Sequence, residues 1–496
     1  MDHTPQRPEH QIDWKTWVGA ATLMLLALSC ALAFPFWPNR LLLLDMGKLV
    51  GYGWSSFLPW LGGILLWVLA LLMLCWRLRG ATWARSRLLV ITTTVVIHTM
   101  FIMMYPTSAI DVYIYAARSR LFSHYGQNPN AIEPVIYWDI DPYMHFASQE
   151  WADDLSPYGP LWNTLAYPVT AVGGENIGAA IIGFKLLSVI SILVMGWLVY
   201  DLVRLRNQDW AIPAAVFLLW NPLVMWDGIG NAHNDITVML PVVAALWCWA
   251  RGYDQWVVPL LVASVLIKYI TVIFLPMAVI ALWRRNPDWH IRISATLWGL
   301  AWSLIFVAIS LYPFYDLGAI VESAEAQGNR ISLSPAWVVQ ATMAEGGWTP
   351  PTNETVRIVA YALMCVYIAG WMIACWRQPP RLPRAMFEVM FAFMLIASTN
   401  QRHWYVLWIV PLGAALIPGT PWRRTLLWSV TALFGHGCSI WLWYVYDIEQ
   451  RGYYGYAMLI VGIVYGPVLL LALWELVQAF VFGAGRKRGP PLPASA

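Results

Sequence analysis

Residues 105–115 of the chain read YPTSAIDVYIY, and they join an apolar run to a segment of mixed character. Pro106 has no amide proton to donate within a helix, so we expect the apolar helix over 88–105 to end or kink there. Beyond it, apolar side chains recur at helical spacing, and three polar residues share the neighbouring face. These are Asp111, Tyr115 and Arg118. The stretch predicts that a membrane helix ends here and that an amphipathic helix follows at the bilayer surface.

The composition of the chain identifies a membrane protein. Its 496 residues are 59% hydrophobic and 11% charged, and its mean hydropathy is +0.57. Charged residues make up about a quarter of an ordinary soluble domain, so that class is excluded. The 33 tryptophans are typical of side chains that anchor a protein at both membrane interfaces. The six cysteines lie in or beside apolar runs without metal-type spacing, which indicates small core residues.

Apolar runs long enough to enter or cross a bilayer recur along the chain. We expect an all-α polytopic membrane protein, a bundle of about 13–14 transmembrane helices with amphipathic helices in the first large external loop. Few basic residues precede the first run, so a cleaved signal peptide is disfavoured. The runs are 17–36, 57–76, 88–105, 177–200, 211–226, 235–250, 256–283, 293–314, 355–376, 386–398, 404–418, 425–446 and 455–483.

Arginines in the short links orient these runs by the positive-inside rule. The rule places both termini in the cytoplasm, and it places the acid-rich loops over 106–176 and 315–354 outside the plasma membrane. The expected segments are 1–105 with a tail and three membrane helices, 106–176 as external loop, 177–314 as core helices with a hairpin over 227–235, 315–354 as external loop, 355–483 as C-terminal helices, and 484–496 as cytoplasmic tail.

One apolar run conflicts with a single crossing. Residues 256–283 have Arg251 before them and Arg284 after them, so one crossing would put one arginine on the wrong side. We therefore expect a broken or re-entrant pair of short helices hinged near Lys268-Tyr269. Such breaks are tolerated at membrane depth only where they are buried or line a cavity, which makes this segment a candidate site.

Asp111 belongs to a first group of polar residues, together with Tyr113, Tyr115 and Arg118. One interpretation is a carboxylate that caps or salt-bridges a loop helix. The other is a general base at the mouth of a membrane cavity, since a positioned carboxylate accepts a hydroxyl proton.

Residues 155–162, LSPYGPLW, form a second group. Prolines on both sides of Tyr158-Gly159 favour a rigid turn that re-enters the membrane, which is a structural role. Oxygen ligands from the aspartates upstream suit a divalent cation such as Mg²⁺ or Mn²⁺. Their spacing matches no known metal-binding loop, so we expect no metal ligands and no cofactor, with the cation as the alternative. These aspartates are Asp139, Asp141, Asp153 and Asp154.

Residues 220–235, WNPLVMWDGIGNAHND, form a third group, read as a tight external hairpin in which Gly228 and Gly230 permit the reversal. Asn234 or Asp235 is a natural N-cap of the next helix. The density of hydrogen-bonding side chains exceeds the needs of one cap, and hydroxyl-rich ligands such as sugars require such donors and acceptors. These side chains are Asn231, His233, Asn234 and Asp235.

The fourth group is positive. Lys268 lies within an apolar run, and a lysine at membrane depth is costly unless it has a partner or lines a wet cavity. Arg402-His403 precede the aromatic run that contains Tyr405; an anchoring arginine at the interface is the structural alternative. Lys185 also lies within an apolar run, and we assign it a structural role.

In their order along the chain, these motifs resemble the GT-C superfamily of membrane glycosyltransferases. They are most similar to the polyprenol-phosphate-mannose-dependent α-mannosyltransferases of the α-(1→6)-mannopyranosyltransferase type, although Ala232 stands where such turns often have glycine. The matching residues are Asp111-x-Tyr113-x-Tyr115, Gly126-x-Asn128-Pro129, Tyr158-Gly159-Pro160-Leu161, Asn221-Pro222, Gly230-Asn231-Ala232-His233-Asn234-Asp235, Lys268, and His403-Trp404-Tyr405-x-x-Trp408 with Pro411.

The resemblance implies an enzyme that moves a hexose, with mannose as the expected sugar, from a polyprenyl-phosphate donor to a glycan or glycolipid acceptor on the outer face. One carboxylate suffices to take the acceptor proton, and cations stabilise the departing phosphate. We expect Asp111 to be the base of an inverting displacement, and Lys268, Arg402 and His403 to hold the phosphate. The expected sugar and acceptor ligands are Tyr113, Tyr115, Arg118, Tyr158, Asn231, His233, Asn234, Asp235 and Tyr405.

Other classes of membrane protein remain as alternatives. A secondary transporter also places broken helices around a mid-membrane site. A lipid-linked oligosaccharide ligase or pentosyltransferase shares the external site but moves a different cargo. A non-catalytic scaffold does not require so many outward polar groups. The expected partners are the lipid donor, the acceptor and the bilayer, and no nucleic acid.

Overall fold

The computed structural model describes residues 12–108, 110–314, 316, 318–322, 331–446 and 452–482, and its regular elements there are all helices. By length and composition, seven of them can cross a membrane, or up to eight when a pair bent by 53° is counted as one span. The chain is therefore an all-helical, multi-pass membrane protein, as predicted. The seven are α1 (Trp14–Ala33), α4 (Trp54–Arg77), α5 (Trp83–Ile102), α9 (Ile177–Arg206), α14 (Trp289–Leu311), α17 (Asn353–Arg377) and α23 (Tyr453–Phe482).

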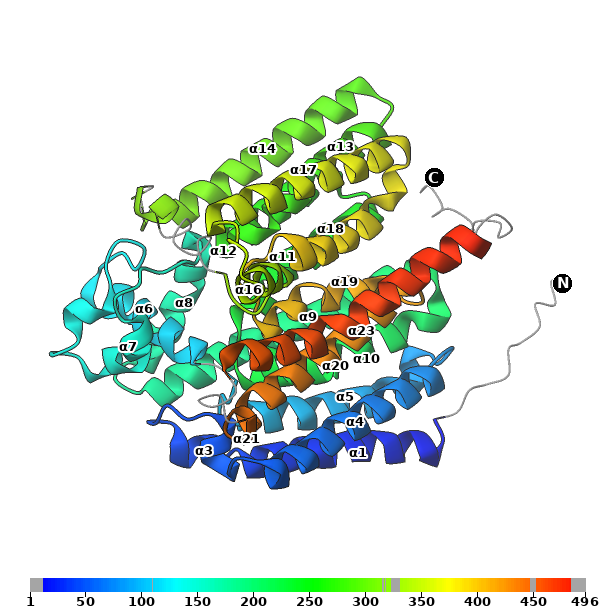
Figure 1. Ribbon diagram of the computed structural model, residues 1–496. Helices are drawn as coiled ribbons and strands as arrows, with labels where there is room; N and C mark the ends of the chain where they lie inside the picture. Colours follow the sequence, from blue (N-terminus) through cyan, green and yellow to red (C-terminus); the bar gives the residue numbers. More distant parts are fainter. Residues whose placement is uncertain are drawn as a thin grey trace.

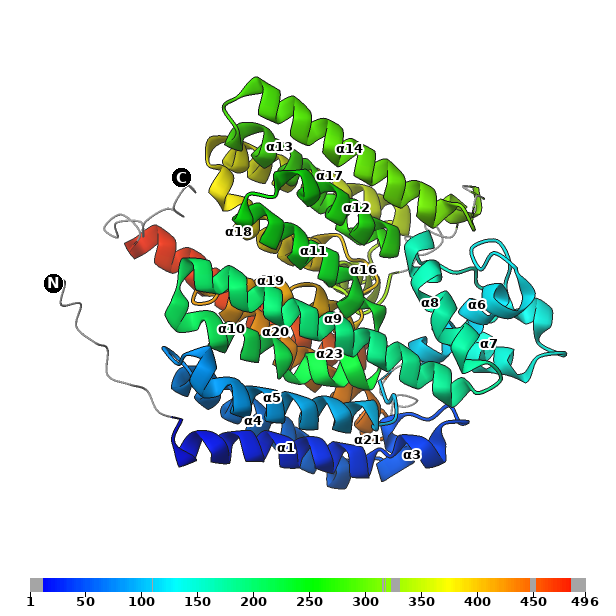
Figure 2. The ribbon, with the colours of Figure 1, turned by 180° about the vertical axis from the view of Figure 1, so that it is seen from behind.

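Shorter apolar helices complete the bundle and run alongside the long ones (Figure 1; Figure 2). The bent pair comprises α10 and the π-helix η4. The total of about 13–14 crossings stays a prediction, because none of these other helices alone is both long enough and apolar enough to count as a span. They are α10 (Ala211–Leu219), η4 (Val224–Gly230), α11 (Asn234–Arg251), α12 (Val257–Ile267), η6 (Tyr269–Phe274), α13 (Leu275–Arg285), α18 (Leu382–Ile396), η8 (His403–Trp408), α19 (Val410–Ala415), α20 (Thr420–Trp441) and α21 (Trp443–Tyr446).

A cap of helices from the first long loop lies at one end of the bundle (Figure 1). Its main helix, α6 (Asp111–Tyr125), differs from the expected surface helix, because every residue from Val112 to Leu121 is buried. Helix α8 and η2 pack against α6, and Arg120 forms an ion pair with Asp141 at 2.5 Å. The other cap elements are η1 (Pro134–Tyr137), η2 (Pro142–Ala147), α7 (Ser148–Trp151) and α8 (Pro160–Gly173).

The segment from α12 to α13 turns back on itself. Its break lies at Lys268, whose backbone is extended (φ −152°, ψ 122°) between α12 and η6. Arg285 Nη1 at the end of α13 lies 3.1 Å from Asp254 Oδ1 just before α12, and Asn286 Nδ2 donates to Asp254 Oδ2 at 2.9 Å. The two ends of the segment therefore meet, and Lys268 lies at its tip, at the end of the bundle that carries the cap.

The opposite end of the bundle gathers arginine ion pairs. Arg251 and Arg204 both pair with Asp201, the latter at 2.7 Å. Arg424 pairs with Glu388 at 3.0 Å, and it pairs with the Glu475 side chain of α23 at 2.6 Å. The start of α1 and the end of α23 lie at this same end (Figure 1). We call it the arginine end.

Candidate active site

Lys185 fixes the chain just before Asp111. It is fully buried in α9, and its ammonium group donates hydrogen bonds to the carbonyls of Phe101, Ile102 and Met104. Carbonyls at the end of a helix lack helical partners and carry partial negative charge, so a cation there satisfies them. Lys185 thus has a structural role at the end of α5, and it positions the connection that leads to α6.

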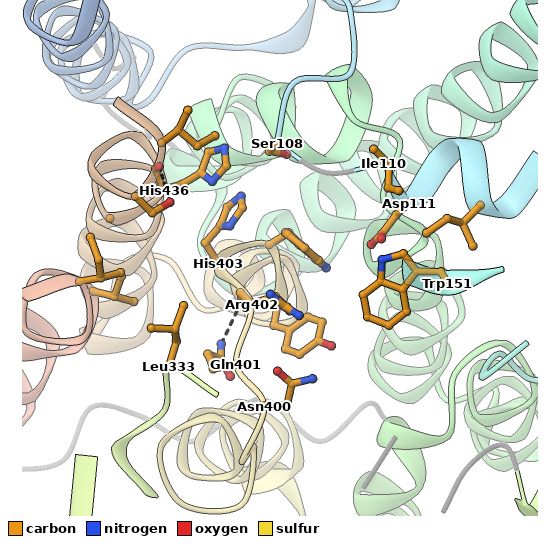
Figure 3. Close-up of a pocket in the computed structure, with 18 of the residues that line it drawn as sticks. Ser108, Ile110, Asp111, Trp151, Leu333, Asn400, Gln401, Arg402, His403 and His436 are labelled. Atoms are coloured by element: carbon orange, nitrogen blue, oxygen red, sulfur yellow. Dashed lines mark hydrogen bonds between the residues drawn. The ribbon is translucent and has the colours of Figure 1, made fainter. Parts of the chain in front are cut away.

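Asp111 is the first residue of α6, and its carboxylate opens onto a cavity (Figure 3). Its Oδ2 lies 3.2 Å from Nδ1 of the buried His233, and its side chain is 21% exposed. Burial alone would raise the pKa of Asp111, but the hydrogen bond and charge of His233, with the charges of Lys268 and Arg402, hold that pKa below its ordinary value. Asp111 is therefore an ionised carboxylate that can accept a proton.

The chain reverses between η4 and α11 in a way that differs from the expected tight hairpin. The π-helix η4 continues through Gly228 and Gly230 and is wholly buried; such π-bulges are frequent at functional sites. The left-handed position of the reversal is taken by Ala232, with φ 52°. Glycine adopts positive φ without steric cost, so it is the residue expected at such a position.

Asn234 and Asp235 do not cap helix α11, so the capping interpretation is wrong. His233 is the N-cap residue, and no side chain caps this helix. Asn234 Oδ1 instead lies 3.4 Å from the hydroxyl of Tyr115, which donates to it. Asn231 Oδ1 accepts a hydrogen bond from the Ser108 amide at 2.9 Å, and so ties the reversal to the start of α6.

Asp235 and Lys268 form a buried ion pair at the cavity wall. Lys268 Nζ lies 2.5 Å from Asp235 Oδ1, and Trp408 Nε1 donates to the same oxygen at 2.6 Å. The ammonium group also lies 5.8 Å from the ring centroid of Tyr158 and 5.0 Å from that of Tyr405. Aromatic faces attract cations at such distances, so the rings and the carboxylate together stabilise the charge of the ammonium group.

Arg402 and His403 line the cavity from the side opposite Asp111 (Figure 3). His403 Nε2 lies 3.4 Å from Oδ2 of the buried Asp227, and its ring stacks on His436 with centroids 3.9 Å apart. Asp227 and His436 are not among the predicted site residues. The signal for Asp227 was a lone carboxylate within the apolar run before Gly228; His436 had no signal beyond its place in an apolar helix.

The cavity has a volume of about 380 Å³. It brings together Asp111, the cations and the aromatic residues from segments far apart in the sequence. The predicted site residues that line it are Asp111, Arg118, Tyr158, Lys268, Arg402, His403 and Tyr405.

The other predicted residues lie behind this lining. Tyr115, Asn231, His233, Asn234 and Asp235 are buried, and they hold the lining residues in place.

Tyr113 lies away from the cavity. Its hydroxyl donates to the Arg40 carbonyl at 3.2 Å, and its ring stacks on Phe146 with centroids 5.4 Å apart. Side chains on one helix point in different directions, and the x-Tyr-x-Tyr spacing alone does not tell which tyrosine faces the site.

The aspartates upstream of Tyr158 do not form a metal-binding group. Asp141 is engaged by Arg120 and by the hydroxyl of Tyr125, which donates at 3.0 Å. The described residues include no group of three or more His, Cys, Asp or Glu side chains that could hold a metal ion. The alternative of a cation at these aspartates therefore gains no support.

Comparison with known proteins places this site in a family. The family model described as alpha-(1→6)-mannopyranosyltransferase, N-terminal domain, matches residues 16–284. Alpha-(1→6)-mannopyranosyltransferase A of Corynebacterium glutamicum is 28% identical over 179 residues, 35% of each chain. Alpha-(1→6)-mannopyranosyltransferase A of Mycobacterium tuberculosis is 26% identical over 274 residues, 54% of this chain and 51% of the relative.

A third match covers a larger share of the chain. A probable alpha-(1→6)-mannopyranosyltransferase of Mycolicibacterium smegmatis is 22% identical over 374 residues, 66% of each chain. The chain thus spans between about a third and two thirds of the length of these curated relatives. Because the family model covers more than half of the chain, the protein belongs to the alpha-(1→6)-mannopyranosyltransferase family, a family of GT-C membrane glycosyltransferases.

Proposed function

We propose that the protein transfers mannose from a polyprenyl-phosphate donor to a hydroxyl of a glycan or glycolipid acceptor, forming an α-(1→6) linkage by inverting displacement. The observation that carries the proposal is a single cavity in which Asp111 faces Lys268 and Arg402. A base and a cationic pocket on opposite sides of one space suit a reaction that removes a proton and expels a phosphate.

In the proposed reaction, Asp111 takes the proton of the acceptor hydroxyl. The hydroxyl oxygen forms a bond to the anomeric carbon while the bond from that carbon to the phosphate oxygen breaks. The phosphate leaves with the electron pair, and its growing negative charge is stabilised by Arg402 and Lys268. Within the described residues, no carboxylate forms an ion pair with Arg402, so its charge is available to the phosphate.

An apolar groove beside the cavity supports a lipid-linked donor. It has a volume of about 510 Å³, lies between η6, α17, α18 and η8, and shares Asn400 and Tyr405 with the cavity. Val272 and Tyr361 in its lining are about half exposed, so the groove opens on the outside of the bundle. A polyprenyl chain in this groove would place its phosphate at the Arg402 side of the cavity.

We further propose that the cavity faces the outside of the plasma membrane. The arginine end of the bundle is opposite the cap, and basic residues favour the cytoplasmic side. On this orientation, the start of α1 and the end of α23 are cytoplasmic. The donor must then be lipid-linked, because nucleotide sugars are cytoplasmic.

The test is transfer from polyprenyl-phosphomannose by purified Asp111→Asn. Asparagine keeps the size of the side chain but cannot take up the proton, so we expect kcat to fall by about 10²–10⁴-fold. Asp201→Asn, at the arginine end, is the matched control for loss of a buried carboxylate. Activity of Asp111→Asn within about threefold of the parent would remove Asp111 as the base. If another lipid-linked sugar were transferred faster than mannose, the assignment of mannose as the donor sugar would be wrong, but the proposed type of reaction would stand.

A further inference from the structure

Two carboxamide side chains precede Arg402 in the chain, and the proposed reaction uses neither of them. Asn400 and Gln401 both line the cavity, and Figure 3 shows them on the side of Arg402, away from Asp111. Asn400 also lines the apolar groove that we propose for the polyprenyl chain. The two residues therefore lie where a lipid-linked donor would pass from the groove into the cavity, next to the proposed phosphate site.

The carboxamide of Gln401 has a partner for its nitrogen but not for its oxygen. The residue is 4% exposed, and its Nε2 donates to the backbone carbonyl of Arg402 at 3.2 Å. A carbonyl only accepts hydrogen bonds, so this contact fixes which end of the amide is the nitrogen. Among the described residues, the buried Oε1 has no hydrogen-bond donor.

The backbone around Gln401 is held by a segment of the second long loop. The Gln401 amide donates to the Ser332 carbonyl at 3.1 Å, and the Ser332 amide donates to the Thr399 carbonyl at 3.0 Å. Leu333 follows with φ 45° and also lines the cavity. Residues other than glycine keep a positive φ only where their surroundings hold them. The two segments thus form one fixed wall of the cavity, and this wall carries Gln401.

A buried carbonyl oxygen without a donor is destabilising, and proteins leave few such atoms unsatisfied. A ligand that donates a hydrogen bond would remove this cost at Gln401. Of the three parts of the proposed donor, the polyprenyl chain has no donor group and the ionised phosphate offers acceptors. The sugar carries hydroxyl groups that donate. A phosphate bound at Arg402 brings the sugar attached to it close to the neighbouring residue Gln401.

We propose that Gln401 is a specificity-determining residue for the donor sugar, and that its Oε1 accepts a hydrogen bond from one hydroxyl of the mannose. The inference rests on the proposed function, which places the donor phosphate at Arg402. A site built to hydrogen-bond a substrate hydroxyl rejects the analogue that lacks it, because the buried oxygen is then left unpaired. Gln401 takes no part in the proton transfer, which stays with Asp111.

The test compares Gln401→Met with the parent on polyprenyl-phosphomannose and on its 2-, 3-, 4- and 6-deoxy analogues. Methionine keeps the length of the side chain and lacks the carboxamide. The measured quantity is kcat/KM for the mannose donor divided by kcat/KM for each analogue. A missing hydroxyl changes the reactivity of the sugar equally in both proteins, so that effect cancels. We expect this ratio to fall about 10- to 100-fold for one analogue and to stay within about threefold for the others.

The pattern across the analogues separates recognition from structural damage. Damage to the fold lowers kcat/KM for every donor alike and leaves all the ratios unchanged, so unchanged ratios in Gln401→Met would overturn the role of Gln401. Gln340→Met is the matched control. The Gln340 Nε2 also donates to a backbone carbonyl, that of Pro351 at 2.8 Å, and Gln340 is not among the described residues that line the cavity. Its ratios should equal those of the parent.

A second variant covers a failure of Gln401→Met to fold. Gln401→Asn keeps the carboxamide and shortens the side chain by one carbon–carbon bond, about 1.5 Å, and it enters the same comparison with the same two outcomes. Asp111→Asn, assayed in parallel, separates the two proposals. Retained activity of Asp111→Asn would overturn the proposed function itself, whereas unchanged ratios together with an inactive Asp111→Asn would overturn only the role of Gln401.

Discussion

The arginine end of the bundle and the cavity hold their buried carboxylates with different partners. At the arginine end, Asp201 pairs with Arg251 and Glu388 pairs with Arg424. A guanidinium group stays charged at every pH that proteins survive, and its planar fork holds a carboxylate in one geometry. Such pairs fix helices against one another and cannot exchange protons.

Around the cavity, the carboxylates face groups that can exchange protons or face a substrate, whereas Asp141 in the cap pairs with Arg120, as the carboxylates of the arginine end do with their arginines. Asp111 and Asp227 lie 3.2 Å and 3.8 Å from the two ring nitrogens of His233, an imidazole where the arginine end has a guanidinium group. Asp235 faces Lys268, whose ammonium group also borders the cavity. Buried carboxylates occur in both regions, so burial does not distinguish them. The partner does: structural carboxylates pair with arginine, and the carboxylates around the cavity lie beside histidine or lysine.

Lys268→Met should have the largest effect in this comparison. It leaves Asp235 buried without a cation, and it removes a charge from the proposed phosphate pocket. We expect kcat/KM for the lipid donor to fall by about 10²–10³-fold, since loss of one partner of a buried charge pair costs about 2–5 kcal/mol. Steady-state kinetics with polyprenyl-phosphomannose measure it.

The double variant Lys268→Met with Asp235→Asn separates stability from donor binding. It removes both charges of the pair, so the unfolding temperature should return toward that of the parent. The donor KM should stay high, because no cation is restored. A double variant that regains donor affinity would contradict a role of Lys268 at the phosphate.

Arg424→Met is the corresponding change at the arginine end. It removes the cation that pairs with Glu475 and leaves Glu388 with Arg384, and we expect it to reduce the free energy of unfolding by about 3–5 kcal/mol. The kcat of the folded fraction should stay unchanged, because Arg424 lies far from the cavity. Thermal unfolding in detergent and kinetics on the same preparation measure both. A loss of kcat in the folded fraction would contradict a purely structural role of the arginine end.

Ala232→Gly should have the smallest effect, and a favourable one. Alanine at φ 52° carries a steric cost that glycine does not, and we expect a gain of up to about 1 kcal/mol in the free energy of unfolding. Ala245→Gly, in the middle of α11, is the matched control and should lose about 0.5–1 kcal/mol. Equal losses in the two variants would show that the reversal does not strain Ala232.

The sequence predicted those features that depend on local chemistry. Arginines on both sides of 256–283 predicted a break near Lys268, and the break lies at that residue. The reason is electrostatic: the positive-inside rule acts on short flanking links, which a single sequence displays. The all-helical membrane fold was predicted from the composition and from the apolar runs, which are also local features of the sequence.

Features that depend on packing between distant segments were not predictable. The burial of α6 from Val112 to Leu121 arises because α8 and η2 cover it, and no local pattern encodes those contacts. The place of Asp227 beside the cavity was not predicted, because a carboxylate shortly before two glycines is typical of a turn. Its position is defined by contacts with Ser108 and His403, which come from segments remote in the sequence.

The hairpin of α12 and α13 restricts how the chain can change in length. Its two legs are joined at the arginine end through Asp254 and Arg285, while Lys268 at the tip must meet Asp235. One inserted residue in a helical leg would shift the tip by about 1.5 Å and turn it by roughly 100°. We therefore expect an insertion or deletion in either leg to break the Lys268–Asp235 contact, and one in the links outside the legs to leave it intact.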